Sequence, residues 1–65
     1  MDFSEKVKYV RATLLITQKE LAKLIGVSNV TICRWETQGL KPTFLDEKKF
    51  EKFCNESNIK FEVKK

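Results

Sequence analysis

Between residues 29 and 34 the chain has an arginine, an asparagine and a valine, side-chain types that could make specific contacts with another molecule. Arg34 can bond the O6 and N7 atoms of a guanine, and Asn29 can pair with N6 and N7 of an adenine. Val30 can pack on a thymine methyl group. The chain has no His, and it shows no paired carboxylates, nucleophile–base pair or glycine-rich phosphate loop. We therefore predict binding rather than catalysis, with no catalytic residues.

The cysteines do not indicate a metal site. Cys33 and Cys54 lie far apart, and neither has a Cys or His neighbour at ligand spacing. Without these ligands no closed metal site can form, so we predict no metal and no cofactor. The chain opens without a signal-peptide pattern, and no apolar run approaches the roughly 18 residues of a membrane span. We expect reduced thiols, a cytoplasmic protein and no membrane partner; no small-molecule ligand is evident.

Length and charge narrow the class of protein further. A chain of 65 residues has room for one domain, residues 1–65, with a thin apolar core. It carries 13 basic and 9 acidic residues, a net charge of +4. A basic balance favours a polyanionic partner, because neutralising phosphates releases condensed counterions. The basic net charge is informative only if the basic residues lie close to the structural element that would recognise the partner.

Apolar spacing and capping residues predict two helices in the first half of the chain. Phe3, Val7, Val10 and Leu14 recur at helical spacing, which predicts a helix over residues 3–14. Thr17 and Glu20 form a capping-box pair that begins a second helix. Gly26 ends that helix, because glycine adopts the left-handed conformation without a Cβ clash.

Two further helices and a tail are predicted after Gly26. Ser28 caps a third helix that fades by residues 38–39, and Thr43 or Asp46 caps a fourth that ends near residue 58. Residues 59, 61 and 63 then alternate with charged residues in a strand-like pattern. The tail, residues 58–65, either folds back onto the core through Ile59 and Phe61 or pairs with a second subunit. The fold class is all-α.

Between Thr17 and Glu36 the chain reads TQKELAKLIGVSNVTICRWE, with Lys41-Pro42 close behind. This run resembles the Cro and phage-repressor (XRE) type of helix-turn-helix, and the resemblance covers roughly residues 4–57. It implies a compact four-helix repressor-like domain with a central helix-turn-helix at about residues 17–37. A fifth helix, which the family often has, is left open. The family's usual glycine two residues after the Trp-Glu pair is replaced here by Gln38, and Gly39 follows.

The resemblance also implies roles for individual side chains. The residues implied at base edges are Asn29, Val30, Arg34 and Gln18. The residues implied at phosphates are Thr17, Gln18, Ser28, Thr31, Lys41 and Thr43. Arg11 and Glu36 are implied to form a structural ion pair between the first and third helices. Trp35 is expected in the core, and Cys33 is interpreted as a small space-filling residue rather than a redox switch.

The function implied is sequence-specific binding of double-stranded DNA by a bacterial or phage transcriptional regulator that reads the major groove with its third helix. Such domains bind as dimers, so we expect a weak homodimer on DNA, with the tail as one candidate interface. The alternative is a helix-turn-helix protein-interaction or antitoxin-type adaptor module with little sequence-specific DNA binding. The side chains of Arg34, Asn29 and Gln18 favour the first interpretation.

Overall fold

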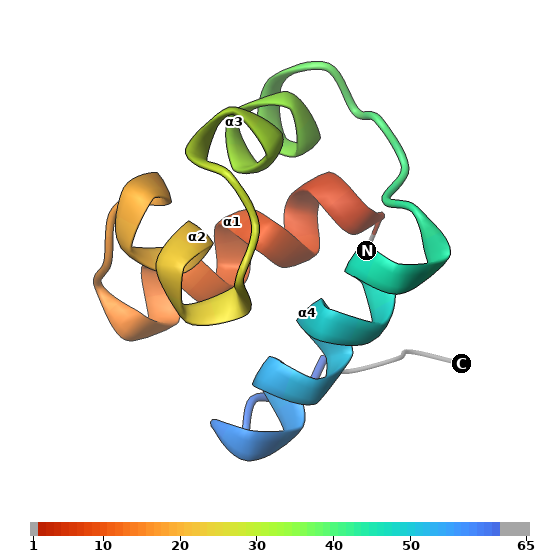
Figure 1. Ribbon diagram of the computed structural model, residues 1–65. Coiled ribbons are helices and arrows are strands. Elements are labelled where there is room, and N and C mark those ends of the chain that lie inside the picture. Colours follow the sequence, from red (N-terminus) through yellow and green to blue (C-terminus); the bar gives the residue numbers. More distant parts are fainter. Residues whose placement is uncertain (1, 62–65) are drawn as a thin grey trace.

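The computed structural model describes residues 2–61, and these fold into four helices without a strand. The helices are α1 (Phe3–Leu14), α2 (Gln18–Ile25), α3 (Asn29–Thr37) and α4 (Phe44–Glu56). Figure 1 shows α2 and α3 on one side of α1, with α4 crossing below. The all-α prediction is confirmed. None of the helices in the described residues is long and apolar enough to cross a membrane.

Side-chain caps explain where the helices begin. Asp2 and Thr17 each form a full capping box, with Glu5 and Glu20 as the reciprocal partners. The hydroxyl of Ser28 accepts a hydrogen bond from the third residue of α3. Thr43, not Asp46, caps α4, because the Thr43 side chain accepts the Asp46 backbone N–H at 3.2 Å. Helix α4 ends at Glu56, two residues earlier than predicted.

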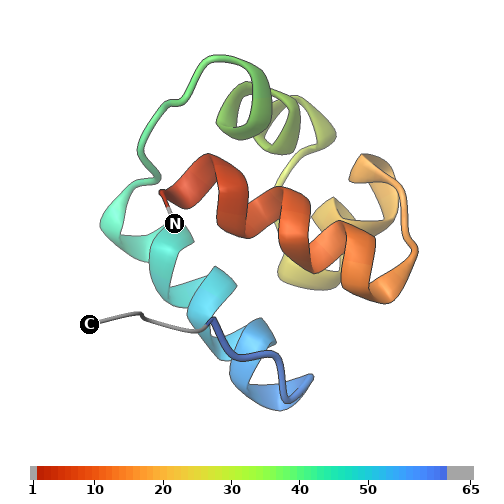
Figure 2. The same cartoon turned by 180° about the vertical axis from the view of Figure 1, so that it is seen from behind.

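The core lies where α1, α2, α3 and α4 meet, as the reverse view in Figure 2 shows. Its fully buried side chains are Val7, Val10, Leu21 and Ile32. Trp35 is also buried, and its ring meets Phe3 edge-on with centroids 4.9 Å apart. Phe50 of α4 also packs against Phe3, with ring centroids 5.0 Å apart. Trp35 is therefore a core residue, as expected.

The described part of the tail folds back onto the core and forms no strand. The chain reverses at Asn58, which has a φ of 61°, and the Ile59 N–H then bonds to the Cys54 carbonyl at 2.9 Å. Ile59 is buried, and Phe61 packs against Tyr9 and Phe50. Figure 2 shows this segment returning beside α4. Val63 lies outside the described residues.

Candidate nucleic-acid interface

A tight turn joins α2 to α3 and sets the angle between them. Gly26 has a φ of 93°, which an L-residue rarely adopts, and its N–H bonds to the Ala22 carbonyl at 2.8 Å. The Gly26 carbonyl accepts a 3.3 Å hydrogen bond from Lys49 of α4. The buried side chains of Leu21, Ile25 and Ile32 hold the two helices against the body. One face of α3 is consequently left toward solvent.

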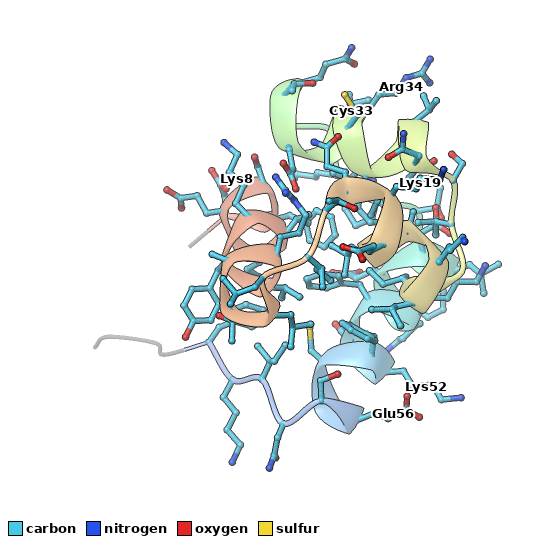
Figure 3. All side chains as sticks on the ribbon, turned by 90° about the vertical axis from the view of Figure 1, so that its left-hand side faces the viewer. Lys8, Lys19, Cys33, Arg34, Lys52 and Glu56 are labelled. Carbon is cyan, nitrogen blue, oxygen red and sulfur yellow. The ribbon has the colours of Figure 1, made fainter. Side chains whose placement is uncertain are left out.

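The exposed face of α3 carries the side chains predicted at base edges. Asn29, Val30 and Arg34 are all exposed, and the accessible fraction of Val30 is 56%. Figure 3 shows Arg34 directed away from the body of the domain, with Cys33 on the same helix. Cys33 is half-buried and its thiol is free. This face offers a cationic donor fork, an amide and an apolar contact side by side.

Hydroxyl groups line the start of α3, but they are already engaged. The Ser28 Oγ accepts the Thr31 N–H at 3.1 Å and lies 2.9 Å from the Thr31 Oγ1. Because each hydroxyl oxygen has further bonding capacity, both side chains can still meet a phosphate. Ser28 is exposed and Thr31 is half-buried, so the two differ in how easily a ligand reaches them.

The start of α2 lies close to the end of α3, where Gln18 bonds to Glu36. Thr17 is engaged in its capping box, where its Oγ1 accepts the Glu20 N–H at 3.1 Å. The backbone N–H groups of the next two residues, Gln18 and Lys19, belong to the helix's open first turn, which favours an anion. Figure 3 shows Lys19 exposed at this end of the helix. A phosphate placed here would meet both N–H groups and positive charge.

Lys41 and Thr43 flank α3 from the other side. Both are exposed, and they belong to the loop that leads into α4. Figure 1 shows this loop on the far side of α3 from the beginning of α2. The structure therefore does not bring Lys41 and Thr43 together with Thr17 and Gln18. The two groups instead lie on either side of α3, as contacts to two separate segments of a phosphate backbone would require.

Arg11 and Glu36 form a bidentate ion pair that ties α1 to the end of α3. Arg11 Nε lies 2.6 Å from Glu36 Oε2, and Arg11 Nη2 lies 2.7 Å from Oε1. The carboxylate side chain is only 4% exposed. Burial opposes its ionisation, but hydrogen bonds from Arg11 and Gln18 and the charges of Arg11 and Lys8 hold the pKa of Glu36 below its ordinary value. The same hydrogen bond raises the pKa of Arg11.

Sequence reasoning missed a second partner of this carboxylate and a nearby cation. Gln18 Nε2 donates to Glu36 Oε1 at 3.1 Å, which joins the start of α2 to the ion pair. Lys8 lies one helical turn from both Ser4 and Arg11, and Ser4 Oγ donates to the Glu36 carbonyl at 3.0 Å. Figure 3 shows Lys8 on the side of α1 that faces α3. Residues 4, 8 and 11 are spaced so that they lie on one face of a helix, and this spacing could have indicated that Lys8 lies near the ion pair.

Two short helices joined by a tight turn, with the second one exposed along its outer face, define a helix-turn-helix. The helix-turn-helix family model matches residues 7–57, and the chain belongs to this family, of the Cro and phage-repressor type. No curated protein and no solved structure matches the chain. Membership in the family supports DNA binding as the general activity.

Proposed function

We propose that the chain is a sequence-specific regulator that reads the major groove of duplex DNA with α3 and acts by occupying its site rather than by catalysis. The observation that carries this proposal is the exposed face of α3, where Asn29, Val30 and Arg34 stand together. These three side chains suit adenine, thymine methyl and guanine edges. A bacterial or phage source and a cytoplasmic location belong to the same proposal.

Phosphate contacts would set the register of α3 in the groove. In this proposal the open N–H groups at the start of α2 and the hydroxyl of Ser28 bind one segment of the DNA backbone. Lys41 and the N-terminus of α4 at Thr43 bind the other segment. Such contacts position a protein without carrying sequence information. The net charge of +4 adds a salt-dependent attraction.

A weak homodimer on DNA is part of the proposal. The domain measures 33 × 22 × 21 Å. Half-sites one helical turn apart have centres about 34–36 Å from each other. Two copies at that spacing would meet only at their edges, which favours an association that depends on DNA. Ile59 and Phe61 pack on their own core, so the described part of the tail, residues 58–61, offers little apolar surface for this contact.

A second candidate function is supported by a different surface. Phe44 and Leu45 at the start of α4 are 74% and 64% exposed, and Leu40 in the preceding loop is 48% exposed. Exposed apolar side chains gathered in one segment are typical of protein contacts. An adaptor that binds another protein through this segment is therefore the alternative.

Selection of binding sites from random duplexes at a fixed salt concentration separates the two functions. The proposed function predicts that the protein enriches a short motif. If the protein enriches no motif and its residual binding disappears at moderate salt, the proposed function is contradicted and the adaptor is favoured.

A further inference from the structure

The side-chain amide of Gln18 is held in one orientation by the carboxylate of Glu36. Gln18 Nε2 lies 3.1 Å from Glu36 Oε1. An ionised carboxylate only accepts hydrogen bonds, so the amide must turn its nitrogen toward it. The opposite orientation would place the amide oxygen against a negatively charged oxygen. The assignment of nitrogen and oxygen in Gln18 therefore follows from its partner's chemistry.

The carboxylate itself is fixed. Its Oε1 accepts from both Gln18 and Arg11, and its Oε2 accepts from Arg11 Nε at 2.6 Å. With its side chain 4% exposed, Glu36 has little room to rotate. The contact between Arg11 of α1 and Glu36 of α3 thus holds the carboxylate as a rigid hydrogen-bond acceptor next to Gln18, the first residue of α2.

The orientation leaves the carbonyl oxygen of Gln18 turned away from the carboxylate. Within residues 2–61 this oxygen has no hydrogen-bond partner, and no side-chain oxygen or nitrogen is both buried and unpaired. It is therefore accessible to solvent at the start of α2. Phosphate oxygens only accept hydrogen bonds, so this oxygen cannot bond to them. The donors that the major groove offers are the amino groups of adenine N6 and cytosine N4.

We propose that Glu36 acts as a positioning residue for base recognition: by orienting Gln18, it makes the chain prefer adenine or cytosine over thymine or guanine on the contacted strand at an outer base pair of its site. This inference rests on the proposed function. Gln18 then reads a base through its side-chain oxygen. Toward a phosphate, its side chain can offer only the remaining amide N–H, in addition to the backbone N–H of the same residue.

Binding-site selection on four proteins tests the inference. Wild type and Gln38→Ala, a matched control at an exposed glutamine, should enrich adenine or cytosine over thymine or guanine on one strand at one outer position by roughly fivefold. Gln18→Ala and Glu36→Gln should lose that preference at that position alone. In the second variant the neutral amide of the new side chain can accept or donate, so it no longer fixes the orientation of Gln18.

A double variant covers the case in which Glu36→Gln does not fold. Arg11→Met with Glu36→Met removes both charges, so no unpaired charge is left in the interior. With its fold checked by circular dichroism, it should also lose the outer preference, although Gln18 is intact. If Gln18→Ala weakens binding to every sequence equally, the inference is overturned while the motif at the other positions upholds the proposed function. If wild type enriches no motif, both the inference about Glu36 and the proposed function are contradicted.

Discussion

Glu36 is the one charged side chain that is buried among residues 2–61. Removing a carboxylate from water is costly unless its oxygens are well paired, and here Arg11 and Gln18 provide three hydrogen bonds. The Arg11–Glu36 pair was expected from the resemblance. The contact of Gln18 was not, because nothing in the pattern of residues indicates that positions 18 and 36 meet. Contacts between distant polar residues depend on the packing angle of helices, which local spacing does not specify.

The lowered pKa of Glu36 makes stability depend on pH. A carboxyl group with a depressed folded-state pKa stabilises the fold above its unfolded value, ordinarily 4.5, and this contribution is lost as pH falls toward the folded-state value. We expect the free energy of unfolding to decrease below about pH 4.5 with a slope from this group of at most about 1.4 kcal/mol per pH unit. Urea titrations between pH 3 and 7 measure it. The Arg11→Met, Glu36→Met variant should show a shallower decrease, and an unchanged slope would contradict this assignment.

At the scale of the elements, the helix starts and the α2–α3 turn were predictable, because side-chain caps and Gly26 act locally. The bounds of α1 and the caps at Thr17 and Ser28 agree with the sequence patterns. The exit from α3 differs from the family pattern. Gln38 ends the helix in a right-handed conformation, and Gly39 adopts the positive φ of 64° one residue later. Relative to the family pattern, the glycine lies one residue later in the chain, and the positive φ is found at that later residue as well.

Gly26→Ala tests how the turn between α2 and α3 is stabilised. A Cβ at Gly26 would meet no atom within 4 Å, so only backbone strain opposes the substitution. We expect the free energy of unfolding to decrease by about 1–2 kcal/mol, the cost of a left-handed conformation in an L-residue. Chemical denaturation measures it. Leu15→Gly is the matched reverse change, because exposed Leu15 has a φ of 57°, and it should shift stability in the opposite direction. Shifts of the same sign would refute the strain argument.

At the scale of the whole molecule, the chain buries a small core and leaves the outer face of α3 exposed to solvent. Of the two alternatives that the sequence left open for the tail, Ile59 and Phe61 adopt the fold-back onto the core. Alternation of residues 59, 61 and 63 is strand-like, but a strand needs a partner, and the described residues provide a hydrophobic surface instead. Ile59 enters the core and Phe61 packs beside Tyr9. Tertiary packing therefore decides the conformation here, over the local pattern.

Ile59→Ala measures what the tail contributes to the fold. Because Ile59 is 8% exposed, its truncation should lower the free energy of unfolding by about 2–4 kcal/mol, through lost burial and a residual cavity. Lys60→Ala, at the exposed neighbour, should change it by no more than about 0.5 kcal/mol. Equal effects of the two substitutions in chemical denaturation would mean that the tail does not belong to the core.

The most direct test of the central claim compares wild type with Arg34→Ala on the selected DNA site and on its single base-pair variants, at one salt concentration. If α3 reads the major groove, Arg34→Ala loses about 1–3 kcal/mol of discrimination at one base pair, most naturally a guanine, and keeps its preferences elsewhere. Uniform weakening across all variants, with every preference retained, would contradict the account and reduce Arg34 to a phosphate contact.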